Sequence, residues 1–204
     1  MSIFSKKPNK PTRQEIMSSH LLDVRNNTEL SNSLTALQNE ITVSFDMKVI
    51  AITSINRNKL SAGFAKGLAD TFALNGSNAL IIDANLYDPR LAMLLNAEVD
   101  ENSSLKKLDE GVDVVYLTKE TYPPQVFKGG TIQKIIKDNF DKYEHIIIIV
   151  PSITEHKEIV LLSKVIDSVI LLAQRNVTKR VDLYEAISYC YDNKLPLAKT
   201  VVVK

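Results

Sequence analysis

Six short, almost wholly apolar runs recur along this chain, and they constrain its fold more than any other feature. They lie at residues 48–54, 78–83, 112–117, 145–150, 168–173 and 197–203. Their length and β-branched content are typical of strands buried on both faces. Segments with helical patterns separate them, at about 60–75, 90–95, 123–140, 155–166 and 178–192. Alternating strands and helices predict a three-layer α/β fold of the Rossmann type, with a mostly parallel sheet between helices.

Two segments precede the first of these strands. Residues 1–28 are polar, with bases interleaved between Pro8 and Pro11, and we interpret them as a flexible tail. Residues 29–44 place leucine and isoleucine at helical spacing, which predicts an amphipathic helix on the edge of the domain. A chain of 204 residues suits one sizeable domain, so we expect a single α/β domain over 29–204.

Composition excludes several classes of function. A net charge of +1 and an aromatic content of 6% give neither a basic field nor stacking platforms for nucleic acid. The single cysteine, Cys190, cannot form an internal disulfide, which fits a reducing cytoplasm. No apolar run approaches the roughly 20 residues that span a bilayer. We therefore expect a cytoplasmic protein that reaches the inner face of the membrane through a partner or a surface charge.

Met47 to Ala69 has the outline of a phosphate-binding loop: a buried strand, a short polar loop and a helix. Such a loop needs glycines that let backbone N–H groups approach the anion, a lysine for the phosphates and a hydroxyl for magnesium. The loop residues are Asn56, Arg57, Asn58, Lys59, Leu60, Ser61 and Ala62. They include no glycine. The sequence predicts the shape of a phosphate site without its chemistry.

Other candidate residues favour structural interpretations. Asp83 ends the second strand, and a lone carboxylate there is commonly a capping or structural acid. Cys190 lies on the last predicted helix without a partner histidine, as a buried small hydrophobe does. Gly129-Gly130 indicates a bend in the predicted helix at 123–140. For Thr178 to Arg180, a helix start and a nucleotide contact both stay open.

Several other positions complete these expectations. Asp88 and Pro89 are the types expected at the N-cap and first position of the short helix at 90–95. The three histidines show no spacing typical of a metal site; they are His20, His145 and His156.

The motifs resemble those of the bacterial tyrosine kinases of capsule and exopolysaccharide synthesis, a branch of the MinD/ParA-like P-loop ATPases. The segments that carry this resemblance are Ile52-Thr53-Ser54, Leu68-Ala69, Ile81 to Leu86 with Pro89, Tyr143, Ile146 to Ile148 with Pro151, and Asp167 to Ile170. The resemblance runs from about residue 29 to 203 and implies a P-loop-like fold. It also implies where the family's catalytic groups would lie.

The family's phosphate loop reads roughly TSxxPGxGKST. Aligned without gaps, Asn58 and Leu60 stand at its two glycines, Ser61 at its lysine and Ala62 at its serine. Added β-carbons obstruct the approach of phosphate to the backbone. Without the lysine and the hydroxyl, the loop has neither its charge clamp nor a magnesium ligand.

The family's two acidic motifs are altered as well. The motif similar to DADxRNP retains Asp83, which in the family helps to position magnesium and the attacking hydroxyl, but has Asn85 at its second aspartate and Tyr87 at its arginine. The motif similar to VIIDTPP places Ile149 at its aspartate, and isoleucine cannot coordinate a cation. The family's spaced arginines are missing between Glu29 and Leu37, and no C-terminal tyrosine cluster follows the last strand.

Together these changes predict a catalytically degenerate homologue that binds no ATP or magnesium and acts as a regulatory or scaffold partner in polysaccharide synthesis. Its expected partner is a membrane chain-length regulator or a kinase paralogue, and it could form homo-oligomers. An active ATP-binding tyrosine kinase or ATPase, with Asp83 and Asn85 holding a cation, remains the alternative. A ParA/MinD-like positioning protein is a third interpretation.

Overall fold

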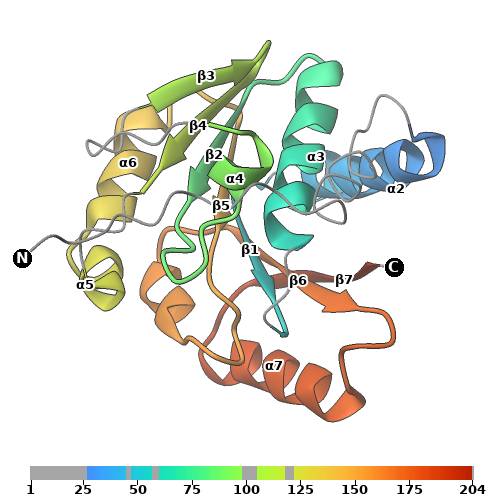
Figure 1. Cartoon of the computed structure of the whole chain (residues 1–204), viewed down its shortest axis with the longest axis vertical. Coiled ribbons are helices and arrows are strands. Elements are labelled where there is room, and N and C mark those ends of the chain that lie inside the picture. Colours follow the sequence, from blue (N-terminus) through green and yellow to red (C-terminus); the bar gives the residue numbers. More distant parts are fainter. Residues whose placement is uncertain (1–26, 45–46, 57–59, 98–104, 118–121, 204) are drawn as a thin grey trace, which may run out of the picture.

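The computed structural model describes residues 27–44, 47–56, 60–97, 105–117 and 122–203. Their strands form one sheet in the order β3-β4-β2-β5-β1-β6-β7 (Figure 1). The strands are β1 (Val49–Ser54), β2 (Ala79–Asp83), β3 (Leu105–Asp109), β4 (Val112–Tyr116), β5 (His145–Ile149), β6 (Ser168–Gln174) and β7 (Leu197–Val203). All neighbouring strands are parallel except β3 and β4, which are antiparallel. The predicted mostly parallel α/β sheet is confirmed.

Helices cover both faces of this sheet, which gives three layers (Figure 1). One face packs against α2 (Thr28–Asn39), the π-helical segment η1 (Glu40–Ser44), α3 (Leu60–Leu74) and α4 (Leu91–Leu94). The other packs against α5 (Pro123–Lys128), α6 (Thr131–Asn139), the 3-10 helix η2 (Glu158–Leu162) and α7 (Arg180–Asp192). Every residue of β1, β2 and β5 is buried, as expected for central strands between two helical layers.

The predicted amphipathic helix at 29–44 is present as α2 followed by η1. The side chain of Asn27 caps α2 by accepting a hydrogen bond from the backbone N–H of Leu30 at 3.0 Å. Leu34, Leu37 and Ile41 are buried against the sheet. The predicted tail at 1–28 falls almost wholly on residues 1–26, outside the described residues.

Two predicted helices differ in the structure, and one strand was not predicted. Residues 123–140 form two helices, because Gly130 adopts a left-handed backbone (φ +77°) between α5 and α6. Residues 155–166 form only the short 3-10 helix η2, not a longer α-helix. Strand β3 was not predicted, since three of its five residues are charged and it is held at the sheet edge by pairing with β4.

Cys190 and His145 are both buried and packed against neighbouring side chains. Cys190 is buried between α7 and the sheet, as predicted, and burial raises the pKa of its thiol to about 11. The ring of His145 stacks on Phe72 at a centroid distance of 3.7 Å. His20 lies outside the described residues. No described helix is long and apolar enough to cross a membrane.

Candidate functional site

The predicted site lies at the carboxyl edge of the sheet, where the segments after β1, β2, β5 and β6 meet. This edge is where parallel α/β sheets usually bind their ligands. The order β2-β5-β1-β6 places the first loop, the Asp83 loop and the Pro151 loop next to one another. The prediction that these segments lie at one edge of the sheet is confirmed.

Loop β1–α3 is fastened to the loop after β5. Thr53 donates its hydroxyl hydrogen to the carbonyl of Pro151 at 2.7 Å. The carbonyl of Ile55 accepts hydrogen bonds from the hydroxyls of Ser152, at 3.3 Å, and Thr154. The side chain of Ile55 is fully buried in the core on the α5–α7 face of the sheet. This part of the loop therefore packs as protein interior.

Asn56 connects the same loop to the start of α7. Its amide oxygen accepts a hydrogen bond from the Thr178 hydroxyl at 3.0 Å, and its amide nitrogen donates to Asp182 at 3.3 Å. Thr178 also accepts a bond from the backbone N–H of Gln174 at 2.9 Å. These contacts give Thr178 a structural role at the β6–α7 turn. Of the predicted loop residues, Arg57, Asn58 and Lys59 lie outside the described residues.

The first turn of α3 holds the other predicted loop residues, Leu60, Ser61 and Ala62. Ser61 and Ala62 are buried, and α3 packs along β1, β2 and β5. Ser61 carries a short neutral hydroxyl and Ala62 a methyl group, and neither supplies a positive charge for a phosphate. The described part of this turn supplies packing surface and no positive side chain.

Asp83 is buried at the end of β2 and accepts two backbone hydrogen bonds. The N–H of Asn85 lies 3.2 Å from one carboxyl oxygen, and the N–H of Leu91 lies 3.3 Å from the other. Leu91 is the first residue of α4, so Asp83 caps this helix from a neighbouring strand. The predicted N-cap, Asp88, instead pairs with Arg90 at 2.7 Å, and α4 begins after the predicted start at residue 90.

The surroundings of Asp83 disfavour the ionised form of its carboxyl group. Ile149 is its register partner on β5 and Tyr116 its partner on β4, so all three side chains share one sheet face. Burial raises the pKa of Asp83 to about 7, and its two backbone hydrogen bonds only partly oppose this shift. The buried hydroxyl of Tyr116 has no hydrogen-bond partner among the described residues.

The side-chain atoms around Asp83 do not fit the coordination of a magnesium ion. Magnesium prefers an octahedral set of oxygens and usually binds one or two protein carboxylates. Asp83 directs both of its oxygens to backbone N–H groups, and the amide oxygen of Asn85 accepts from the N–H of Asp88 at 3.3 Å. Ile149 supplies only hydrocarbon beside them. No group of three His, Cys, Asp or Glu side chains in the described part of the chain could hold a metal.

Sequence reasoning missed a polar contact between two loops of this edge. The hydroxyl of Tyr87 donates to the carboxylate of Glu158, and its ring stacks on His156 at 3.6 Å between centroids. Tyr87 stands where the family motif has arginine, so the substitution was visible. Its partner, 71 positions later in the sequence, was not.

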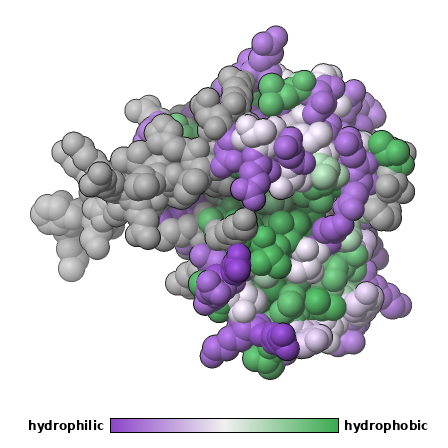
Figure 2. Space-filling view, turned by 90° about the vertical axis from the view of Figure 1, so that its right-hand side faces the viewer, coloured by the Kyte–Doolittle hydropathy of each residue, from purple (hydrophilic) through white to green (hydrophobic). Residues whose placement is uncertain are grey.

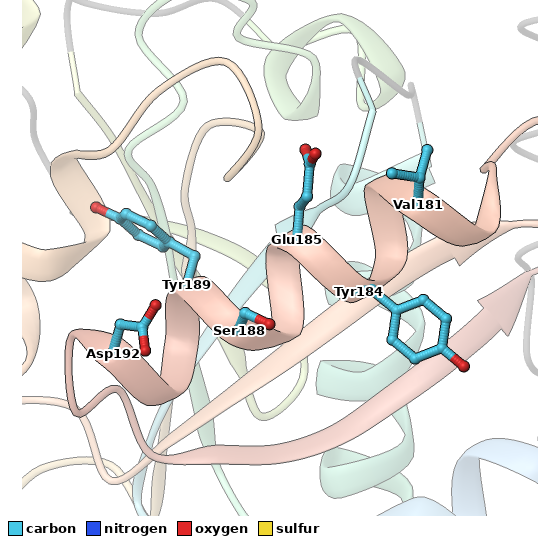
Figure 3. Close-up of a pocket in the computed structure, with 6 residues that line it drawn as sticks. All are labelled: Val181, Tyr184, Glu185, Ser188, Tyr189 and Asp192. Atoms are coloured by element: carbon cyan, nitrogen blue, oxygen red, sulfur yellow. The ribbon is translucent and has the colours of Figure 1, made fainter.

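A depression of about 560 Å³ lies on the face of α7 (Figure 3). Its lining residues all come from this helix: Val181, Tyr184, Glu185, Ser188, Tyr189 and Asp192. None of them was among the predicted site residues. The depression is open and lined by one element only, so it does not form part of the site at the carboxyl edge.

Comparison with solved structures identifies the fold. The chimerical protein CapA2B2 is 16% identical, with 91% of this chain and 89% of that chain covered and a TM-score of 0.80. The kinase domain of Escherichia coli tyrosine kinase ETK is 12% identical, with 98% and 83% covered and a TM-score of 0.80. A chain of the MinC:MinD cell division protein complex of Aquifex aeolicus is a more distant likeness: it is 18% identical, with 76% of this chain and 68% of that chain covered and a TM-score of 0.57.

These likenesses agree with the resemblance that the motifs predicted. The chain has the P-loop-like fold shared by bacterial tyrosine kinase domains and MinD/ParA ATPases. No protein-family model matches the sequence, and no curated protein matches it either. At identities below 25%, the likeness describes the fold and leaves the chemistry to the residues of the site.

Proposed function

We propose that this protein is a catalytically degenerate homologue of the polysaccharide-synthesis tyrosine kinases, acting as a non-catalytic binding or regulatory partner. The observation that carries the proposal is the environment of Asp83. The one retained carboxylate of the acidic motifs is buried beside Ile149 and bound to two backbone N–H groups. Asp83 therefore caps the start of α4, whereas the matching aspartate of the family helps to position magnesium.

The phosphate side of the site supports the same proposal. Ile55 fills the core, Asn56 is bound to α7, and the buried start of α3 has Ser61 and Ala62 at the lysine and serine positions. Phosphoryl transfer depends on positioned cations that neutralise the β- and γ-phosphates. Neither ATP nor magnesium is therefore a cofactor in this proposal, and no transfer step is assigned to the chain.

The proposed partner is a membrane chain-length regulator or a kinase paralogue, met at the cytoplasmic face of the membrane. The resemblance of the motifs to capsule and exopolysaccharide kinases supports this choice of pathway. The likeness of the fold to tyrosine kinase domains supports the same choice.

A phosphotransfer assay and an affinity capture test the two halves of this proposal. The full chain, incubated with Mg·ATP and a tyrosine polymer, should release no ADP and transfer no phosphate above the level of a sample without protein. When the full chain is used as bait on membranes of its source cells, a polysaccharide-assembly protein should bind to it and be recovered with it. ADP release that disappears in Asp83→Asn would favour the alternative, an active kinase or ATPase with atypical motifs.

A further inference from the structure

One side of α7 presents apolar and acidic side chains to solvent. The residues that line its depression recur at intervals of three and four along the helix, so they form one face (Figure 3). We call this the α7 face, and its members are Val181, Tyr184, Glu185, Ser188, Tyr189 and Asp192. Val181 is 54% exposed and Tyr184 is 68% exposed. Exposed apolar groups bordered by polar ones are typical of a surface that binds another segment of chain.

The carboxylates of the α7 face form no salt bridge with a base in the described part of the chain. Glu185 and Asp192 are both exposed, and neither is paired there. Arg180 precedes the face and Lys194 follows it, but no lysine or arginine belongs to its lining. Because like charges repel, a basic segment would bind between these two flanking bases, where the carboxylates lie.

The acidic surface continues beyond α7. A second depression, of about 450 Å³, shares Tyr189 with the α7 face and is otherwise lined by residues that follow β5. Its lining includes the carboxylates of Glu155 and Glu158. Its one lysine, Lys157, is engaged within the chain: Nζ donates to the carbonyl of Ile153 at 2.6 Å and lies 4.1 Å from the centre of the Tyr189 ring. Carboxylates therefore outnumber bases along both depressions.

The chain contains a segment with the complementary chemistry. Residues 6–13, KKPNKPTR, carry four bases and no acid, and they lie outside the described residues. Pro8 and Pro11 are three positions apart. A polyproline II helix has about three residues per turn, so residues at this spacing lie on the same side. Such PxxP segments bind in grooves lined by aromatic side chains, and the α7 face supplies the rings of Tyr184 and Tyr189.

We propose that residues 6–13 bind to the α7 face of the same chain, with the prolines against the tyrosine rings and the bases facing the carboxylates. The lengths agree, because a helix advances about 16 Å from Val181 to Asp192 and six residues of polyproline II cover about the same distance. The segment can also reach the face. The 16 residues from Pro11 to Asn27 span up to ~53 Å when extended, against a diameter of ~40 Å for a compact domain of this length.

The charge of the α7 face favours this occupant more than the surface in Figure 2 does. Figure 2 views the side on which Figure 1 places α2 and the end of β7, and hydrophobic residues gather in the middle of that face. The centre of that face therefore offers apolar contact and not an opposite charge. On α7 the bases of the segment pair with carboxylates, which withholds them from an anionic membrane surface.

Paramagnetic broadening of NMR signals in the full chain tests this contact. A nitroxide label is attached at Ser5→Cys, next to the segment, and the chain's own cysteine is buried. The amide signals of Glu185 and Ser188 should be broadened by the label. Reversing both charges of the face, with Glu185→Lys and Asp192→Lys together, should remove this broadening. The matched control is the double variant Asp138→Lys and Asp141→Lys at exposed positions in and after α6, which should keep it.

Exchange of the charges keeps this test independent of folding. Changing Lys6, Lys7 and Lys10 together to glutamate should abolish the broadening in the native background and restore it in the charge-reversed background. Absence of broadening in the native chain would overturn the proposal, as would equal broadening in native and charge-reversed chains.

A mixture of isotope-labelled chain with spin-labelled, isotope-free chain separates contacts within one chain from contacts between copies. The mixture should show no broadening at Glu185 and Ser188. Broadening as strong as in the singly prepared chain would assign the contact to a second copy and contradict binding within one chain.

Discussion

Among single residues, Asp83 is the one whose chemistry depends most on its neighbours. A carboxyl group at the end of a strand in a nucleotide site is normally ionised and exposed to a cation. Here it is buried beside Ile149, and burial raises its pKa to about 7. A group with this pKa is neutral in the folded protein over much of the range in which an ordinary aspartate is charged.

The raised pKa of Asp83 predicts a pH dependence of stability. The folded protein holds this proton more tightly than the unfolded chain, so the contribution of Asp83 is fullest below about pH 4. It decreases as the pH rises through about 7, by up to ~4 kcal/mol in the free energy of unfolding. Chemical denaturation of native protein and Asp83→Asn between pH 4 and 8 measures this slope, which the variant should lack.

The control for this measurement is Asp138→Asn on the exposed side of α6, which should keep the native slope. The comparison uses the pH slope of the free energy of unfolding and not its absolute value. Asp83→Asn also replaces one of the two carboxyl oxygens that accept N–H bonds, and this affects stability independently of titration. Equal slopes in native protein and Asp83→Asn would show that Asp83 does not titrate as its burial requires.

The Tyr87 contact allows a second test at this scale. Tyr87→Phe removes the hydrogen bond to Glu158 and keeps the stacking on His156, so it should reduce the free energy of unfolding by about 1–2 kcal/mol. Tyr87→Ala should cost more, because it removes both contacts. Thermal and urea unfolding measure these losses. Tyr184→Phe on the exposed face of α7 is the matched control and should be neutral; an equal loss in both phenylalanine variants would contradict the assignment.

At the scale of elements, the break between α5 and α6 shows what a glycine contributes. Gly130 has a φ of +77°, and no atom lies within 4 Å of the position that a β-carbon would take. Gly130→Ala should therefore cost about 1 kcal/mol through backbone strain alone. Gly130→Asn should cost less, because asparagine tolerates the left-handed region better. Urea unfolding measures both; a larger loss for asparagine would indicate a steric cause instead.

The elements that were predicted and those that were missed are stabilised by different interactions. Strands β1, β2 and β5 were predictable because burial on both faces requires apolar residues throughout. Strand β3, with the sequence LKKLD, has no such requirement and depends on backbone pairing with β4. The start of α4 depends on Asp83, eight residues earlier, and no local cap signal reports that contact.

The candidate site was predictable in position and less so in its contacts. Parallel strands brought Asn56, Asp83 and Pro151 to one edge, as the alternation of strands and helices required. The contacts of Asn56 with Thr178 and of Tyr87 with Glu158 join residues 122 and 71 positions apart. Local sequence patterns carry no signal at such separations.

At the scale of the whole molecule, fold and chemistry have different sequence requirements. The P-loop-like fold needs apolar strands and helices that cover them, and many sequences satisfy this pattern. Phosphoryl transfer needs particular glycines, a lysine, a hydroxyl and carboxylates at fixed positions. This chain meets the first requirement. The proposed loss of catalysis rests on the residues that the motif alignment places at the second, among them Ser61, Ala62 and Ile149.

The most direct test of the proposed loss of catalysis is isothermal titration calorimetry of the full chain with Mg·ATP and Mg·ADP, paired with thermal unfolding at the same ligand concentrations. The altered donors around Asp83 predict no binding heat and no rise in unfolding temperature at millimolar nucleotide. Asp83→Asn serves as the matched variant and should behave as the native protein does. Micromolar binding that requires magnesium and is lost in Asp83→Asn would contradict the account.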